Sequence, residues 1–380
     1  MIPALSTTDV VRLLREGTAV TWAYADVSED REDPQRLASS RRTSAVEALT
    51  RAGAPQQDAE VVADALIEPP GVAAPVSRFL VAQEGAVVVD EILPGPPKLP
   101  DTLGHGPVLD VLPLLAHRPL DVAFLVVEVG KGGGGFRVYR FGHEGVDEEQ
   151  HVQGRTDTLH LSPSGGWDSL RVQHHVEELW RQNLKEVATA IDDAVRRTRA
   201  RLVVVAGDIQ ARQLLAEQLA PATVPLLSMV DADTRASDAL VEQVDIALAR
   251  LLATRVHDAL DLLRTHLNRG DATAASRLGE VVTALGAAQV DTLLIDPQAL
   301  GDRTLLALGD VPWVATSPEE ALGAAVLGEA PAAPALVRAA VLTDAAVVLA
   351  SAGSMPGDSG VGALLRWPIG PATPSAGGTA

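Results

Sequence analysis

The chain has 380 residues, 47% of them hydrophobic, and a formal net charge of −19 at pH 7. At roughly 150 residues for each domain this length predicts two or three domains, and the hydrophobic content excludes a chain that is disordered throughout. The chain contains no cysteine, which excludes disulfide bonds, zinc ribbons and thiol catalysis.

The start of the chain lacks the features that direct a protein into or across a membrane. Residues 1–17 carry neither the basic start nor the apolar run of a signal peptide. No later stretch approaches the ~18 uninterrupted apolar residues of a membrane-spanning helix. We therefore expect a cytoplasmic protein without a membrane partner.

Residues 1–117 are predicted to form a first α/β domain. A strand is expected over 18–25, helices over 37–52 and 56–67, and a hairpin of strands 79–82 and 86–91 that turns at Glu84-Gly85. The stretch 94–107 is rich in proline, which regular elements exclude, so it is predicted to be a loop.

Residues 118–233 are predicted to form a second α/β domain. The expected elements are strands over 122–129 and 136–141, a helix over 169–199, a buried strand over 201–206, a helix over 209–219 and a strand over 224–230. The helix over 169–199 contains neither proline nor glycine and would be ~45 Å long. This alternation indicates a sheet covered by helices.

The remainder is predicted to be a linker helix followed by a third α/β domain. Apolar residues recur at helical spacing over 236–267, within a linker assigned to 234–270. The third domain, 271–368, is expected to contain a helix over 278–285, a strand over 290–295, a short strand over 313–315, a helix over 318–327 and strands over 345–350 and 361–366. Residues 369–380 have a linker composition and are expected to be disordered.

The negative charge is unevenly distributed along the chain. Between His151 and Leu202 there are eight Lys or Arg against seven Asp or Glu, which leaves −20 for the rest of the chain. Four of the nine histidines fall in the same segment. An acidic protein repels nucleic acid, so a contact with a polyanion is expected in this segment, although a solvated helix face would give the same pattern.

A glycine-rich run, Gly130–Gly135, has the composition of a phosphate-binding loop. A phosphate loop ends in Gly-Lys-Ser/Thr and opens a helix. Here the lysine comes too early and a strand is expected next, so the run is predicted to be a flexible hairpin turn.

A second glycine pair stands just before the long helix, in the run Ser162–Ser169. Glycine lets the backbone approach another chain closely, and Asp168 or Ser169 can cap the helix that follows. The run Ser164–Ile191 resembles the loop and long helix of the middle domain in eukaryotic and archaeal class-1 release factors. Gly165-Gly166 match the two glycines of that family's Gly-Gly-Gln tripeptide, and Trp167 stands in the place of its glutamine.

Two further segments extend the resemblance over residues 120–367. Gly279–Asp296 is similar to the start of the C-terminal domain of release factors and Pelota. The region Gln173–His175 and the run Gly360–Arg366 resemble an actinobacterial branch of bacterial archaeo-eukaryotic release factor-like proteins related to the ribosome hibernation factor Balon. The resemblance implies three α/β domains, with a long helix after the Gly-Gly loop in the middle domain.

The departure at Trp167 bears on function. The family's glutamine acts in peptide release at the peptidyl-transferase centre, and an indole lacks its amide. An indole can stack on a base, which favours binding over hydrolysis. RNA contacts are expected at Arg155, His160, Ser164, Gly165, Gly166, Trp167, Arg171, His174 and His175. No catalytic residue or cofactor is predicted. No metal site is predicted either, because His174 and Glu178 share a helix face but no third ligand is visible.

The sequence thus predicts a ribosome-binding translation factor rather than an enzyme. It would act in the aminoacyl site during hibernation or rescue under stress, with the 70S ribosome as partner, a translational GTPase such as elongation factor Tu as a second partner, and no DNA. One alternative is a peptidyl-tRNA hydrolase in which His160 or Asp168 replaces the glutamine. Another is an interaction scaffold without ribosome contact, which the charge of −19 would suit.

Overall fold

The computed structural model describes residues 7–28, 34–72, 74–117, 122–130, 132–140, 145–153, 168–231 and 237–368. These residues form a mixed α/β fold with several sheets, as predicted. They divide into two compact units, one made of residues 1–119 with 255–380 and the other of residues 120–254. The finer domain boundaries proposed from the sequence stay predictions.

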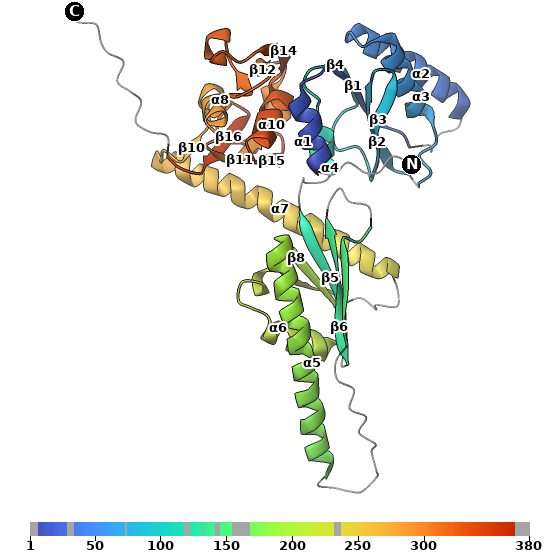
Figure 1. Ribbon diagram of the computed structural model, residues 1–380, viewed down its shortest axis with the longest axis vertical. Coiled ribbons are helices and arrows are strands. Elements are labelled where there is room, and N and C mark those ends of the chain that lie inside the picture. The colour runs from blue at the N-terminus through green and yellow to red at the C-terminus, as the bar shows by residue number, and fades with distance from the viewer. Residues whose placement is uncertain are drawn as a thin grey trace, which may run out of the picture. The chain divides into compact units, whose positions relative to one another are not determined.

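The N-terminal part of the first unit is a four-stranded sheet with two helices against it. Its elements are α1 Thr7–Glu16, β1 Val20–Asp26, α2 Pro34–Arg51, α3 Gln56–Ile67, β2 Val76–Gln83, β3 Ala86–Pro94, β4 Thr102–Gly106 and α4 Leu112–His117, and the strand order is β3-β2-β1-β4. Leu49 of α2, Val62 of α3 and Leu80 of β2 belong to one buried core, which holds both helices on the sheet (Figure 1).

Local sequence predicted the hairpin but missed the edge strand. Gln83 pairs with Ala86, and the two turn residues between them, Glu84 and Gly85, have φ angles of 53° and 78°, as a type I′ turn requires. The predicted loop over 94–107 is wrong in part, because β4 pairs antiparallel with β1. It is an edge strand, a position that tolerates prolines on its flanks.

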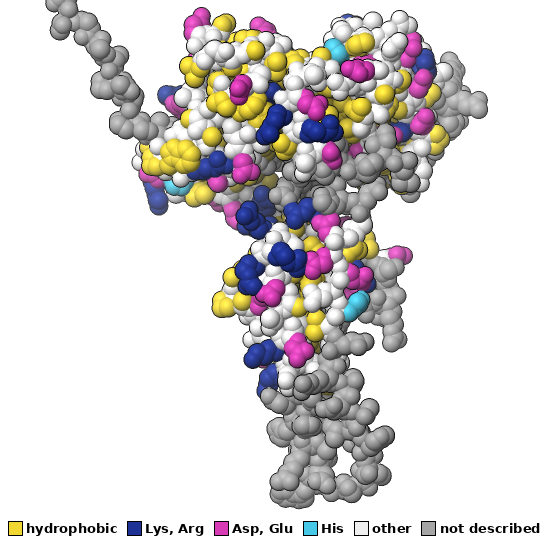
Figure 2. All heavy atoms as spheres, in the orientation of Figure 1, with side chains coloured by type: hydrophobic (Ala, Val, Ile, Leu, Met, Phe, Trp, Pro, Cys, Tyr) yellow, Lys and Arg dark blue, Asp and Glu magenta, His cyan; other side chains and the backbone are white. Residues whose placement is uncertain are grey.

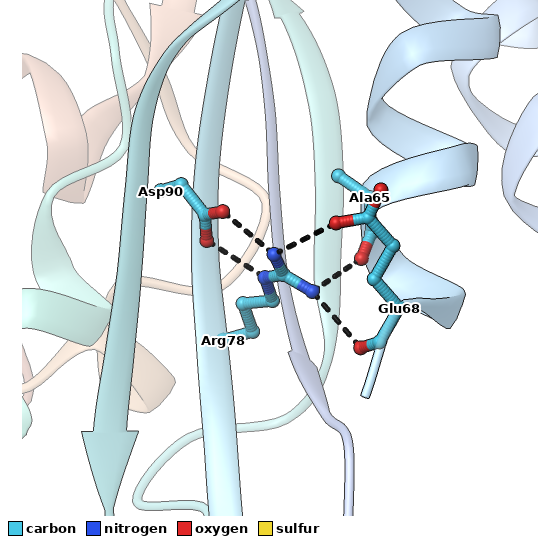
Figure 3. Close-up of polar contacts among 4 residues, drawn as sticks. All are labelled: Ala65, Glu68, Arg78 and Asp90. Atoms are coloured by element: carbon cyan, nitrogen blue, oxygen red, sulfur yellow. Dashed lines mark hydrogen bonds and ion pairs between the residues drawn. The ribbon is translucent and has the colours of Figure 1, made fainter. Parts of the chain in front are cut away.

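A buried arginine ties α3 to this sheet. Arg78 of β2 donates to both carboxylate oxygens of Asp90 on β3, at 2.7 and 2.6 Å. It also donates to the carbonyl oxygens of Ala65 and Glu68 at the end of α3, and its guanidinium lies 3.7 Å from the Glu68 carboxylate (Figure 3). The last carbonyls of a helix lack their usual intrahelical donors. The Ala65 carbonyl accepts from the Glu68 N–H at 3.1 Å, and Arg78 adds a donor to it and to the Glu68 carbonyl while pairing its own charge.

The second unit contains a five-stranded sheet, ordered β7-β6-β5-β8-β9, with helices on both faces. Its elements are β5 Ala123–Gly130, β6 Gly133–Arg140, β7 Glu148–Gln153, α5 Asp168–Thr198, β8 Leu202–Gly207, α6 Ile209–Gln218, η1 Val224–Leu226 and β9 Leu227–Met229. The helix α7 runs over Ser237–Arg269, and its residues up to Thr254 belong to this unit. β5, β8 and β9 run parallel, and β6 and β7 are antiparallel neighbours. One core packs α5 and α6 on the sheet, and a second packs α7 on its other face.

The C-terminal part of the first unit holds two small sheets, ordered β10-β16-β11-β15 and β13-β12-β14. Its elements are β10 Ala274–Ala275, α8 Leu278–Gly286, β11 Val290–Ile295, α9 Pro297–Leu300, β12 Thr304–Leu308, β13 Val314–Ala315, η2 Pro318–Ala321, β14 Val326–Pro331, α10 Ala332–Leu342, β15 Ala346–Leu349 and β16 Val361–Leu365. The helix predicted over 318–327 is wrong, because only one 3₁₀ turn forms there and β14 begins at Val326 to pair with β12.

Arg338 of α10 connects the two halves of the first unit. It is almost fully buried and donates to the carbonyl oxygens of Leu14 at 2.7 Å and Leu308 at 2.9 Å. Burial lowers the pKa of its guanidinium to about 10, so the group is still charged at neutral pH. α1 is thereby held to α10 and β12. Within the described ranges, no helix has the length and apolar character needed to cross a membrane.

Candidate functional site

The long helix predicted after the Gly-Gly segment is present as α5, which runs for 31 residues from Asp168 to Thr198. Arg171, His174 and His175 lie on its first turns, where the structure describes the backbone but not the side chains. Arg155, His160, Ser164, Gly165, Gly166 and Trp167 lie outside the described residues. The RNA contacts assigned to these residues therefore stay predictions.

The second half of α5 is fixed to the sheet by a periodic apolar stripe. Leu184, Val187, Ile191 and Ala194 are fully buried and recur every three or four residues, which places them on one helix face. They pack in the same core as Leu125 of β5 and residues of β6 and β8. The structure thus fixes the direction in which α5 leaves the sheet.

Polar contacts add to this anchoring. The Ala220 N–H and the Thr223 hydroxyl donate to the two carboxylate oxygens of Asp192, at 3.0 and 2.6 Å, which ties α5 to the turn after α6. Arg197 donates to both carboxylate oxygens of Glu148, at 2.6 and 2.9 Å. The hydrogen bond from Arg197 lowers the pKa of Glu148.

The Arg197–Glu148 pair joins the two sides of the predicted loop. Glu148 is the first residue of β7, which runs directly into residues 154–167, and Arg197 lies on the helix that leaves them. The entry strand and the exit helix of this segment are therefore bound to each other at their far ends.

The described half of α5 and the turn after it form a basic surface. Between Trp180 and Arg201 there are six Lys or Arg against three Asp or Glu. The basic side chains are exposed: Arg181, Lys185, Arg196, Arg197, Arg199 and Arg201. Figure 2 shows Lys and Arg side chains gathered around this part of the second unit. In a chain with a net charge of −19, such a surface is suited to a polyanion.

A cavity of about 450 Å³ lies over β5, β6 and β7. Arg137 bridges two carboxylates there, Glu128 at 3.0 Å and Glu149 at 2.9 Å, and His151 lies 3.3 Å from Glu149. The hydrogen bond with Arg137 lowers the pKa of Glu149, and the same bond raises the pKa of Arg137. Arg137 and Glu149 therefore stay ionised and paired at neutral pH, whereas a general acid or base needs a pKa near the working pH.

The glycine-rich run borders this cavity and does not bind phosphate as a P-loop would. Gly130 pairs with Gly133 across a two-residue turn, and the element that follows is β6 rather than a helix. The predicted hairpin is confirmed, but its turn is shorter than the run, because Gly130 belongs to β5 and Gly133–Gly135 belong to β6. Gly134 is required there, because a Cβ would lie 2.7 Å from the backbone carbonyl oxygen of Glu128. Among the side chains that the structure describes, no group of three or more His, Asp or Glu could hold a metal ion.

Comparison with known proteins matches this second unit to a family. Residues 123–269 match the family model "Bacterial archaeo-eukaryotic release factor family 2". Two uncharacterized proteins of Mycobacterium tuberculosis, from strains CDC 1551 / Oshkosh and H37Rv, are each 28% identical over 301 residues, which is 76% of this chain and 78% of theirs.

Two solved structures align with most of the chain at low similarity. The archaeal translation termination factor is 16% identical, covers 96% of this chain and 99% of its own, and has a TM-score of 0.25. Archaeoglobus fulgidus Pelota is 16% identical, covers 98% of this chain and 95% of its own, and has a TM-score of 0.35. Scores this low carry no argument about function, and the predicted branch related to Balon stays a prediction. Residues 123–269, which include α5 and its anchored base, are therefore similar to bacterial archaeo-eukaryotic release factor family 2.

Proposed function

We propose that this chain is a ribosome-binding translation factor that occupies the aminoacyl site in hibernating or stalled ribosomes. The observation that carries the proposal is the family match over residues 123–269, the segment that contains α5 and its anchored base. The exposed basic residues from Arg181 to Arg201 supply charge for rRNA in an otherwise acidic protein.

The anchoring of α5 supports a positioning role. A helix of 31 residues spans about 45 Å, so a small rotation at its base moves its start by several ångströms. The buried stripe and the contacts of Asp192 and Arg197 resist that rotation. Binding by a pre-positioned element avoids the entropic cost of ordering it on the ribosome.

We propose binding without peptide release. Trp167 follows Gly165-Gly166 where the release factors carry glutamine, and its indole offers a stacking surface rather than an amide. Its proposed partners, in the cytoplasm, are the 70S ribosome and a translational GTPase such as elongation factor Tu.

The test is co-sedimentation of the purified full chain with 70S ribosomes at low and moderate salt. Two variants are compared with wild type: Gly165→Ala/Gly166→Ala/Trp167→Ala for the tip, and Lys185→Glu/Arg201→Glu for the basic surface. The matched control is Arg250→Glu/Arg269→Glu, which makes the same charge change at exposed positions of α7. We expect both variants to weaken binding, the control to leave it nearly unchanged, and the salt slope to fall by about 1 for each lost phosphate contact.

If Arg250→Glu/Arg269→Glu weakens ribosome binding as much as Lys185→Glu/Arg201→Glu does, the assay reports the net charge of the chain and not a contact of the basic surface. A wild type that stays in the supernatant at both salt concentrations, with and without the GTPase, would refute ribosome binding. Release of peptide from peptidyl-tRNA on 70S ribosomes, lost in the tip variant, would favour the hydrolase alternative instead.

A further inference from the structure

The small sheet β13-β12-β14 carries a surface charge of one sign. Residues 304–331, which we call the acidic lobe, contain four acidic residues and neither Lys nor Arg. All four acidic side chains are exposed: Asp310, Glu319, Glu320 and Glu329. Most protein surfaces mix both signs, so this lobe has an unusually uniform negative field.

Three large apolar side chains are exposed on the same lobe. Leu322 is 83% exposed, Val311 57% and Val326 49%. The Gly309 N–H donates to the Ala325 carbonyl at 2.8 Å, which brings the turn containing Val311 beside the start of β14. Ala321, next to Leu322, packs against Leu308 in the lobe's own core. Figure 2 shows hydrophobic and acidic side chains mixed over the part that Figure 1 labels β12 and β14.

The loop that presents Leu322 is held in place. Glu320 accepts hydrogen bonds from the Thr316 N–H at 2.9 Å and the Thr316 hydroxyl at 2.7 Å. Leu322 itself adopts the left-handed conformation, with φ 51° and ψ 27°, which a Cβ disfavours and which Asn or Gly adopts more readily. A leucine kept exposed in a strained conformation on a fixed loop points to an anchor for a partner.

We propose that the acidic lobe docks a basic protein segment that inserts an apolar side chain against Leu322, Val311 and Val326. Four carboxylates attract Lys and Arg and repel phosphate, so the charge argues for a protein segment over RNA. A second copy of this chain would bring an equally acidic lobe and a further net charge of −19. Charge complementarity therefore favours a basic protein segment over RNA or a second copy of this chain as the partner of this apolar patch.

The test uses the full chain and synthetic peptides in fluorescence anisotropy. The probe alternates Leu with Lys, and two comparison peptides replace Lys by Glu or Leu by Ser. The key variant is Leu322→Asn, which removes the apolar side chain and suits the left-handed backbone, so its melting temperature should equal or exceed that of wild type. The matched control is Leu262→Gln, because Leu262 is 48% exposed on α7 outside the lobe.

Charge is tested separately with Asp310→Asn/Glu329→Gln, in which the amide oxygen introduced at position 310 can still accept from the Val311 N–H, as the native carboxylate does. The control with the same net charge is Glu217→Gln/Asp258→Asn, at exposed positions outside the lobe. We expect Leu322→Asn to weaken the Leu/Lys peptide about tenfold. The lobe charge variant should weaken it about threefold at low salt, an effect that shrinks as salt is added.

Three outcomes would overturn the proposal. The Lys/Ser peptide could bind as well as the Leu/Lys peptide, which would reduce the interaction to general charge attraction. Leu322→Asn could behave like Leu262→Gln. Wild type could self-associate in sedimentation velocity and lose this on Leu322→Asn, which would make a second copy the occupant. Because the probe is a peptide, ribosome binding and lobe docking can fail independently.

Discussion

Replacing Arg78 by methionine should open the N-terminal sheet of the first unit. Arg78 is only 5% exposed, and its loss removes the guanidinium that donates to the Asp90 carboxylate and to the Glu68 carbonyl, whereas the Ala65 carbonyl keeps the Glu68 N–H (Figure 3). Breaking a buried ion pair costs about 3–5 kcal/mol. The Asp90 side chain is 24% exposed, so water recovers part of this and we expect about 3 kcal/mol.

The measurement is hydrogen exchange of the β2 and β3 amides, read by mass spectrometry on peptides from this sheet. A loss of about 3 kcal/mol accelerates exchange about a hundredfold in the regime where exchange reports opening free energy. The double variant Arg78→Met/Asp90→Leu removes both charges and should recover more than half of the loss, because an apolar pair leaves no buried charge behind. The peptides of α5 serve as an internal control in the other unit.

Acceleration of less than about fivefold in Arg78→Met would refute this account of the sheet. So would a double variant no more stable than the single one, since the cost would then come from lost packing rather than from an orphaned carboxylate.

Three further results are expected. Arg338→Met should speed exchange in α1 and around residue 308. The cost should be about 2 kcal/mol, from three lost charged hydrogen bonds offset by relief of a buried charge, and unchanged exchange in α1 would refute the link. Burial raises the pKa of Asp110 from 3.8 to about 6, so the folded state binds more protons between those values. The unfolding free energy should therefore fall as pH rises through that window, and Asp110→Asn should lack the slope in urea titrations. Ile191→Ala, in the buried stripe of α5, should cost about 3 kcal/mol in urea unfolding of the second unit and leave exchange in β1–β3 unchanged.

The local sequence was sufficient to predict an element where it is compatible with only one backbone conformation. Glu84-Gly85 between two β-rich runs indicated the type I′ hairpin, because few residues accept positive φ at both turn positions. The run from Asp168 to Thr198 lacks proline and glycine and became one helix. For the candidate site, the sequence supplied the Gly-Gly segment and the resemblance, whereas the anchors Asp192, Arg197 and Glu148 went unnoticed. No local signal marks them, because each pairs with a residue at least 28 positions away.

The sequence by itself determined the mixed α/β class, most of the long elements and the −19 charge with its basic exception around α5. Tertiary structure decided the rest, because short apolar segments fit more than one conformation. Val326–Pro331 became a strand only through its pairing with β12, and Thr102–Gly106 only through its pairing with β1. Arginine is usually exposed, and the sequence alone gives no sign that Arg78 and Arg338 are buried. Their burial depends on carbonyls and carboxylates that folding brings to them, since a buried charge is stable only where such partners meet it.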